Sequence, residues 1–317
     1  MPIYQDSENN ILFCILRYLV IICIAAILIA LAIFSTIIHS SGYSEDREIR
    51  FTVTQDIEIH SSNAILFSIK DDEVLYAKEN AARAYPASMT KVMTAIVALE
   101  NIEDLNDTMV LNKEIYDSLL RTGASVAGFQ LNERVKIIDL LYGLMIKSGA
   151  ECSIGLATYV AGSDTAFVKL MNEKAKEIGM NDTHFVNSVG LHDPNHYSTA
   201  NDILTLLKYA LNNETLRTLI TTPEHRSQPT NNHPKGLLMK SHMFALVDNS
   251  SFTGLRFMGG KTGFTNEGRY CLASFGEKFG EEFIVVTFNA PEIEKDRSFH
   301  MQDTRTIFKA IDMYMLD

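Results

Sequence analysis

An uncharged segment of 21 residues, Tyr18 to Ile38, constrains the folding of this chain more than any other feature. At about 1.5 Å of rise per residue, a helix of this length spans roughly the 30 Å hydrocarbon thickness of a bilayer. The apolar part of a cleaved signal peptide is usually shorter, roughly 7 to 15 residues, although Ser40-Ser41-Gly42 is small enough for cleavage. The length favours an uncleaved transmembrane signal-anchor at 18–38, between a short amino-terminal tail, 1–17, and a linker, 39–54.

The part of the chain beyond Gly42 has the composition of a globular protein. It contains 27 lysines and arginines against 37 aspartates and glutamates, a net charge of about −10, with no basic stripe. This charge argues against a nucleic acid partner. The length and the 46% hydrophobic content of the chain suit one sizeable domain or two small ones.

Hydrophobic patterning in this remainder predicts an α+β fold. The apolar runs 64–69 and 73–77 flank Lys70-Asp71-Asp72, which indicates a β-hairpin. Further strands are predicted at 255–258, 270–274 and 283–288, and helices at 137–146, 154–160, 165–178, from within 197–204 to about 211, and at about 303–315. Strands near both ends and helices between them predict one unit whose sheet is assembled from the two chain ends.

A serine and a lysine lie three residues apart in Pro86-Ala87-Ser88-Met89-Thr90-Lys91, at the start of an apolar helical pattern. Positions i and i+3 of a helix are neighbours, so the Lys91 amine can lie beside the Ser88 hydroxyl and take its proton if its pKa is lowered. The free N–H groups of a first helical turn also stabilise an oxyanion. Taken alone, the four residues favour an ordinary helix start with a solvated lysine over a catalytic pair.

Two later motifs favour a catalytic role for Ser88 and Lys91. Ser148-Gly149-Ala150 follows the predicted helix at 137–146, and Lys261-Thr262-Gly263 precedes the strand at 270–274. Ser-x-x-Lys, Ser-x-Asn and Lys-Thr-Gly occur in this order in penicillin-binding proteins and class A β-lactamases. The three motifs together favour an acylating serine.

Longer segments resemble the low-molecular-mass D-alanyl-D-alanine carboxypeptidases, penicillin-binding serine peptidases of the S11 type. The similar segments are Pro86–Ala95, Asp139–Leu144, Gly190-Leu191 with His196–Ala200, and Gly260–Thr265. The resemblance covers about residues 55 to 300. It implies the β-lactamase/penicillin-binding-protein-like transpeptidase fold, an antiparallel sheet flanked by helices plus a helical subdomain, with a catalytic domain at 55–317 that lacks the carboxy-terminal β-domain of many relatives.

The resemblance also implies roles for individual residues. Ser88 would be the acyl-ester nucleophile, Lys91 its general base, and Ser148 a proton relay between Lys91 and the leaving amine. The substrate-binding residues would be Lys261, Thr262, Gly263 and Phe264. Of these, Lys261 and Thr262 would hold the terminal carboxylate, while the backbone N–H groups of Ser88 and Phe264 would form the oxyanion hole.

The second motif departs from the family pattern, because Ala150 stands where relatives usually have asparagine, and Glu151 follows it. The lost amide would contact Lys91 and the substrate backbone, and Glu151 or a water is a candidate substitute. A catalytically weak penicillin- or peptidoglycan-binding protein is therefore one alternative function. A serine β-lactamase is the other, although no Glu-x-x-Leu-Asn-like element for rapid deacylation occurs between Ser148 and Lys261.

No metal or other cofactor is expected. His184, His192 and His196 lie in a turn-rich segment whose spacing fits loop and capping roles better than a metal site. Cys152 and Cys271 lack metal-ligand spacing and are interpreted as small buried residues, although a disulfide between them is conceivable in an oxidising compartment.

The expected partners follow from the family. They are a peptidoglycan stem peptide ending in D-Ala-D-Ala, β-lactams as covalent inhibitors, and the membrane through the amino-terminal helix. Because cell-wall peptides lie outside the membrane, a single-pass protein of the bacterial cell membrane is expected, with residues 1–17 in the cytoplasm and the catalytic domain on the extracytoplasmic face.

Overall fold

The computed structural model describes residues 17–33, 49–53, 56–119, 122–247, 254–293 and 296–315. They fall into two units: the chain ends, Met1–Ile49 with Met315–Asp317, and the body, Arg50–Tyr314.

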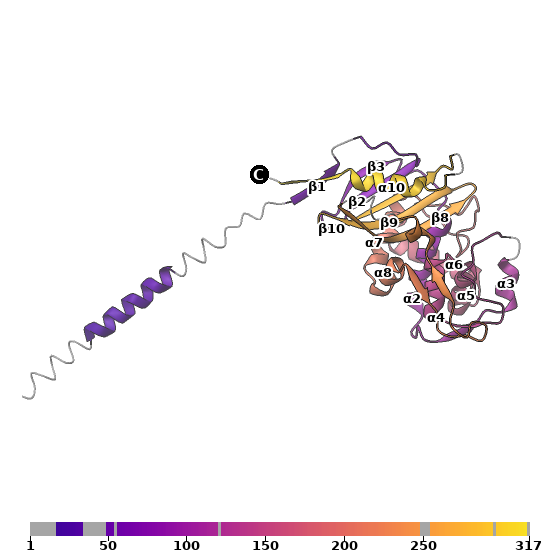
Figure 1. Cartoon of the computed structure of the whole chain (residues 1–317), viewed down its shortest axis with the longest axis horizontal. Coiled ribbons are helices and arrows are strands. Elements are labelled where there is room, and N and C mark those ends of the chain that lie inside the picture. The colour runs from indigo at the N-terminus through magenta and orange to yellow at the C-terminus, as the bar shows by residue number, and fades with distance from the viewer. Residues whose placement is uncertain are drawn as a thin grey trace, which may run out of the picture. The chain divides into compact units, whose positions relative to one another are not determined.

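In the first unit, residues 17–33 form a helix (Figure 1). The large apolar side chains of this helix are exposed. Among the described residues, no helix is both long enough and apolar enough to cross a membrane. Residues 34–38 of the predicted span and residues 1–16 lie outside the described part, as do residues 39–48 and Thr54 of the predicted linker.

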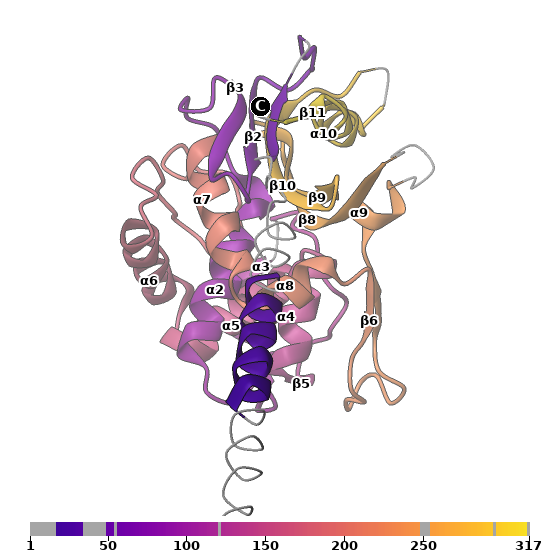
Figure 2. The same ribbon diagram turned by 90° about the vertical axis from the view of Figure 1, so that its left-hand side faces the viewer.

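The second unit is built on a five-stranded antiparallel sheet in the order β3-β2-β10-β9-β8 (Figures 1 and 2). Its strands are β2 (Asn63–Ser68), β3 (Glu73–Lys78), β8 (Leu255–Thr265), β9 (Arg269–Lys278) and β10 (Glu281–Ala290). The predicted α+β class and the assembly of the sheet from both chain ends are therefore confirmed. Strand β8 forms one edge, and this edge borders the site described below.

Most of the helices lie in the chain between β3 and β8, and one follows β10. The longer ones are α2 (Thr90–Asn101), α4 (Ile137–Ile146), α5 (Ala150–Ala161), α6 (Asp164–Glu177), α7 (Ala200–Leu211), α8 (Glu214–Thr221) and α10 (Phe299–Lys309). Figure 2 shows the sheet between α7 and α10, and both helices contact β10. Helix α7 begins as its sequence predicts, since the side chain of Thr199 accepts the N–H of Asp202 at 3.1 Å.

Several short elements escaped prediction. They are the strand pairs β1 (Ile49–Val53) with β11 (Ile311–Met315), β4 (Thr108–Val110) with β5 (Arg134–Lys136), and β6 (Glu224–Arg226) with β7 (Leu238–Lys240), and the helices α3 (Lys113–Leu119), α8 and α9 (His242–Ala245). Strand β1 thus lies inside the predicted linker, 39–54.

The predicted final helix at about 303–315 is wrong at its end, because α10 stops at Lys309 and β11 follows. The Lys278 ammonium donates to the carbonyl oxygens of Phe308 and Lys309, at 3.3 and 3.0 Å, and so satisfies acceptors that the helix end leaves free.

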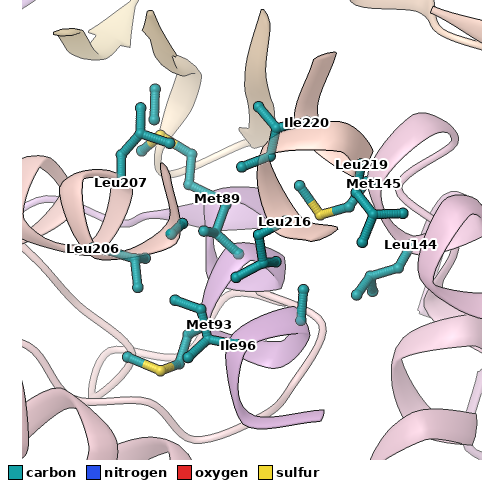
Figure 3. Close-up of a cluster of buried hydrophobic side chains, with 14 of the residues drawn as sticks. Met89, Met93, Ile96, Leu144, Met145, Leu206, Leu207, Leu216, Leu219 and Ile220 are labelled. Atoms are coloured by element: carbon teal, nitrogen blue, oxygen red, sulfur yellow. The ribbon is translucent and has the colours of Figure 1, made fainter. Parts of the chain in front are cut away.

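A continuous apolar core holds the start of α2 in place (Figure 3). Met89, Met93 and Ile96 of this segment are almost completely buried. They pack in a cluster with side chains from α4, α7 and α8, namely Leu144, Met145, Leu206, Leu207, Leu216, Leu219 and Ile220. Burying a methionine or isoleucine side chain stabilises a fold by about 1.5–3 kcal/mol, so the residue next to Ser88 is firmly anchored.

Candidate active site

Ser88 lies in a 3-10 turn, Ala87–Met89, that leads directly into α2. Ser88 thus lies at the start of the helical segment, as predicted, in a turn that is tighter than that of an α-helix. Ala87 has a φ of +48°, and its carbonyl group lies close to the backbone of Gly190. A Cβ on Gly190 would lie 1.9 Å from the carbonyl oxygen of Ala87, so only glycine allows this approach.

The Lys91 amine lies beside the Ser88 hydroxyl, as the spacing predicts. Its Nζ is 3.0 Å from Ser88 Oγ and donates to the carbonyl oxygen of Val189 at 2.6 Å. Only 1% of Lys91 is exposed. Burial, and secondly the charge of Lys261, lower the pKa of Lys91 well below its usual value, which favours a neutral amine with a lone pair for the serine proton.

The segment that supplies the Val189 carbonyl is organised by Asn187. Its Oδ1 accepts the backbone N–H groups of Val189, Gly190 and Leu191 at 3.2, 2.7 and 3.0 Å, and its Nδ2 donates to the Leu191 carbonyl at 3.0 Å. The sequence pattern singled out Gly190-Leu191, whereas Asn187 and Val189 were not predicted. An asparagine three residues before a glycine is a turn signal that would have pointed to this loop.

Ser148 and Lys261 meet on the other side of the site. Lys261 Nζ donates to Ser148 Oγ at 3.1 Å and to its neighbour, the Thr262 carbonyl, at 2.9 Å. Burial lowers the pKa of Lys261 to about 8. Ser148 has a φ of +58°, an uncommon conformation for a serine, in the short connection between α4 and α5.

Strand β8 runs close to the Ser88 turn because of Gly263. A Cβ at this position would lie 2.6 Å from Cys271 Sγ and 3.0 Å from the carbonyl oxygen of Pro86. The missing side chain therefore lets the edge strand contact the turn, and places the backbone of Phe264 at the cleft.

A cleft of about 660 Å³ lies along this contact. All of the predicted site residues line it: Ser88, Lys91, Ser148, Lys261, Thr262, Gly263 and Phe264. A hydroxyl with an adjacent low-pKa amine, a second hydroxyl and a buried cation are thus collected from three distant parts of the chain. This arrangement can acylate a serine with a substrate that carries an anionic group.

Comparison with known proteins shows the family of this chain. A model of the D-alanyl-D-alanine carboxypeptidase family, Peptidase_S11, matches residues 49–292. The chain belongs to the D-alanyl-D-alanine carboxypeptidase family. Its relatives include D-alanyl-D-alanine carboxypeptidase DacF of Bacillus subtilis, 29% identical over 81% of this chain and 66% of the relative, and D-alanyl-D-alanine carboxypeptidase of Streptomyces sp. strain K15, 30% identical over 70% of this chain and 79% of the relative.

Solved structures agree with the family assignment. The Streptomyces K15 DD-transpeptidase superposes with a TM-score of 0.71 at 25% identity, covering 81% of this chain and 98% of that one. The D-alanyl-D-alanine carboxypeptidase of Mycobacterium tuberculosis H37Rv shares the fold, with a TM-score of 0.70 at 23% identity over 81% and 93% of the two chains. The penicillin-binding-protein-like fold is therefore confirmed. The chain spans 66% of the length of DacF and 46% of that of Escherichia coli DacD.

Ala150, the departure from the family's second motif, begins helix α5 and is fully buried. Its N–H donates to the carbonyl oxygen of Ser125 at 2.8 Å. Glu151 is also buried and turns to the neighbouring loop, where its Oε1 accepts the N–H of Gly128 at 2.9 Å. Burial raises the pKa of Glu151, and its Oε2 has no hydrogen-bond partner among the described residues. Both residues thus attach α5 to the loop that includes Ser125.

The histidines near the cleft have structural partners. His196 Nδ1 accepts the N–H of Val186 at 3.2 Å, so its Nε2 donates to Thr90 Oγ1 at 2.8 Å, and burial lowers its pKa to about 4. His184 Nδ1 lies 2.7 Å from the carbonyl oxygen of Asn195. In the described parts of the chain, no group of three or more histidine, cysteine or acidic residues is placed to hold a metal ion.

Cys152 and Cys271 are free and buried. Burial raises the pKa of Cys152 well above its usual value and that of Cys271 to about 12. Both thiols therefore stay protonated at neutral pH, and neither is a competing nucleophile.

Proposed function

We propose that this protein is a serine-type D-alanyl-D-alanine carboxypeptidase that removes the terminal D-alanine from peptidoglycan stem pentapeptides through an acyl-enzyme on Ser88. The observation that carries the proposal is the Ser88–Lys91 pair at 3.0 Å, in which burial and the nearby Lys261 lower the pKa of the amine. A general base is effective when its pKa lies near the working pH.

Acylation begins with transfer of the Ser88 proton to Lys91. Ser88 Oγ attacks the carbonyl of the penultimate D-alanine, and the N–H groups of Ser88 and Phe264 bind the developing oxyanion. As the tetrahedral intermediate collapses, the peptide bond breaks and Ser148 passes a proton to the leaving amine. Water then hydrolyses the ester in the same way, which restores the Ser88 hydroxyl and releases the shortened peptide.

The terminal carboxylate of the substrate is assigned to Lys261 and Thr262. A charged ammonium and a hydroxyl on a rigid strand form strong, directed hydrogen bonds to a carboxylate. Lys261 is only 3% exposed, so its attraction for an anion is little screened by solvent. A penicillin, which also carries a carboxylate beside a reactive carbonyl, would enter the same site and acylate Ser88.

Ala150 favours a second candidate, a binding protein with weak turnover. The side chain at this position offers no amide to Lys91 or to the substrate backbone, and Glu151 binds Gly128. In this candidate, Ser88 is acylated and the acyl-enzyme is released slowly.

We also propose that residues 18–38 anchor the protein in the bacterial cell membrane, with residues 1–17 in the cytoplasm and the catalytic domain outside. The uncharged composition of the segment and the exposed apolar side chains of helix 17–33 support this. Protease treatment of intact cells that leaves the catalytic domain undigested would contradict the topology.

The function is tested with the purified full-length chain. We expect release of D-alanine from a pentapeptide ending in D-Ala-D-Ala, labelling of Ser88 by fluorescent penicillin as shown by mass spectrometry, and loss of both in Ser88→Ala. Labelling without D-alanine release would favour the weak binding protein, and rapid turnover of a chromogenic cephalosporin would favour a β-lactamase. If Ser88 is not labelled and no D-alanine is released, all three functions are wrong.

A further inference from the structure

The cleft has a strong charge asymmetry. Besides Lys91, whose lowered pKa favours the neutral amine, its described lining includes three cations, Lys147, Lys261 and Arg297, and Glu267 is the only carboxylate among the described lining residues. A substrate with a terminal carboxylate explains a cationic cleft, and leaves the acid at Glu267 without a function. A carboxylate in such surroundings is suited to a positive group of the ligand.

Glu267 sits in the turn between β8 and β9, the edge hairpin of the sheet. The turn is held by a hydrogen bond from the Gly268 N–H to Thr265 Oγ1 at 2.8 Å. The Glu267 side chain is 46% exposed, and its Oε2 lies 3.9 Å from Nδ1 of His192, whose ring packs edge-on against Tyr85 at 4.6 Å. The carboxylate is therefore on a rigid element and still accessible to a ligand.

The direction of the bound peptide follows from the proposed function, on which this inference rests. If the terminal carboxylate binds at Lys261 and Thr262 and the reacting carbonyl at the N–H of Phe264, the rest of the peptide continues toward Thr265 and the turn. The peptide then lies antiparallel to edge strand β8, and its residue just before D-Ala-D-Ala lies opposite Thr265. Glu267 lies in the turn that follows Thr265, outside the strand, and lines the same cleft. A long side chain on the peptide residue opposite Thr265 that extends along the cleft toward the turn would therefore meet the Glu267 carboxylate.

We propose that Glu267 determines specificity by binding a side-chain ammonium on the residue that precedes D-Ala-D-Ala in the substrate. The ligand class is thus a stem peptide with a diamino acid at this position. An ion pair of this exposure contributes modestly, about a threefold change in kcat/KM, and weakens as salt increases.

The test uses the full-length chain and two peptides, Nα-acetyl-L-Lys-D-Ala-D-Ala with the side-chain amine free or acetylated. The ratio of their kcat/KM values should be about three in favour of the free amine at low salt and should fall toward one at high salt. Glu267→Gln should reduce the ratio to about one, Glu267→Lys should invert it, and Glu267→Asp should retain part of it. Glu103→Gln, at an exposed position outside the cleft lining, is the matched control and should keep the wild-type ratio.

A ratio that Glu267→Gln and Glu267→Lys leave at the wild-type value would overturn the proposal. A competition assay separates this result from failure of the proposed function. If neither peptide releases D-alanine, the carboxypeptidase function is wrong, and the two peptides are compared by how well they slow penicillin labelling of Ser88. In that assay, the same threefold preference and its loss in Glu267→Gln are expected, and equal protection by both peptides in the wild type refutes the role of Glu267.

Discussion

Lys261 should reduce the stability of the folded protein at neutral pH, as a consequence of its position in the cleft. Burial lowers the pKa of Lys261 to about 8, from its usual value of 10.5. Between these two values the unfolded chain binds more protons than the folded one, so the stability contribution of this residue rises with pH. The penalty is fully present below pH 8 and disappears as the pH approaches 10.5. A shift of this size corresponds to about 3 kcal/mol.

The substitution Lys261→Met removes this titrating group, together with the charge that helps to lower the pKa of Lys91. The free energy of unfolding of the variant, relative to the wild type, should fall by about 3 kcal/mol as the pH is raised from 7 to 10.5. The reason is that the wild type becomes more stable as the buried Lys261 loses its charge, whereas the variant has no charge to lose at this position. Urea unfolding in detergent, followed by circular dichroism at several pH values, gives this difference. Lys176→Met, at an exposed position on α6, is the control and should show a much smaller change. A difference between wild type and Lys261→Met that is constant with pH would refute the reasoning.

Three further predictions concern the same site. The rate of penicillin acylation should decrease as the pH rises through about 8, because Lys261 loses its charge there. Lys261→Arg should move this decrease to higher pH, since arginine stays protonated. An unchanged pH profile in the variant would assign the decrease to another group. Gly190→Ala should lower penicillin labelling at least tenfold, because its Cβ would collide with the Ala87 carbonyl and displace the Ser88 turn; wild-type labelling rates would show that the turn is not constrained from this side. Glu151→Ala should destabilise the protein by about 1–3 kcal/mol, because the half-buried N–H of Gly128 loses its acceptor, whereas Glu151→Gln keeps an acceptor oxygen. Equal unfolding midpoints for Glu151→Ala and the wild type would contradict this.

Local patterns predicted the elements that depend on local interactions. Helix α4 has the bounds that its apolar pattern indicates, and the hairpin of β2 and β3 flanks its polar turn. Strands β1 and β11 were missed, because each is short and pairs with a partner at the other end of the chain. For the same reason, the end of α10 was placed too late: Lys278, which caps it, lies on β9 and gives no signal in the helix sequence itself.

The sequence by itself determined that Ser88 and Lys91 lie side by side, because a spacing of three residues in a helical segment brings two side chains to one face. It also determined the family, through motifs whose order and composition are specific. Only the tertiary structure decided the protonation of Lys91. Its low pKa depends on burial, and on the charge of Lys261, which strand β8 brings from the other end of the chain. Desolvation and Coulomb interaction act through space and not along the chain, so no local pattern could have specified them.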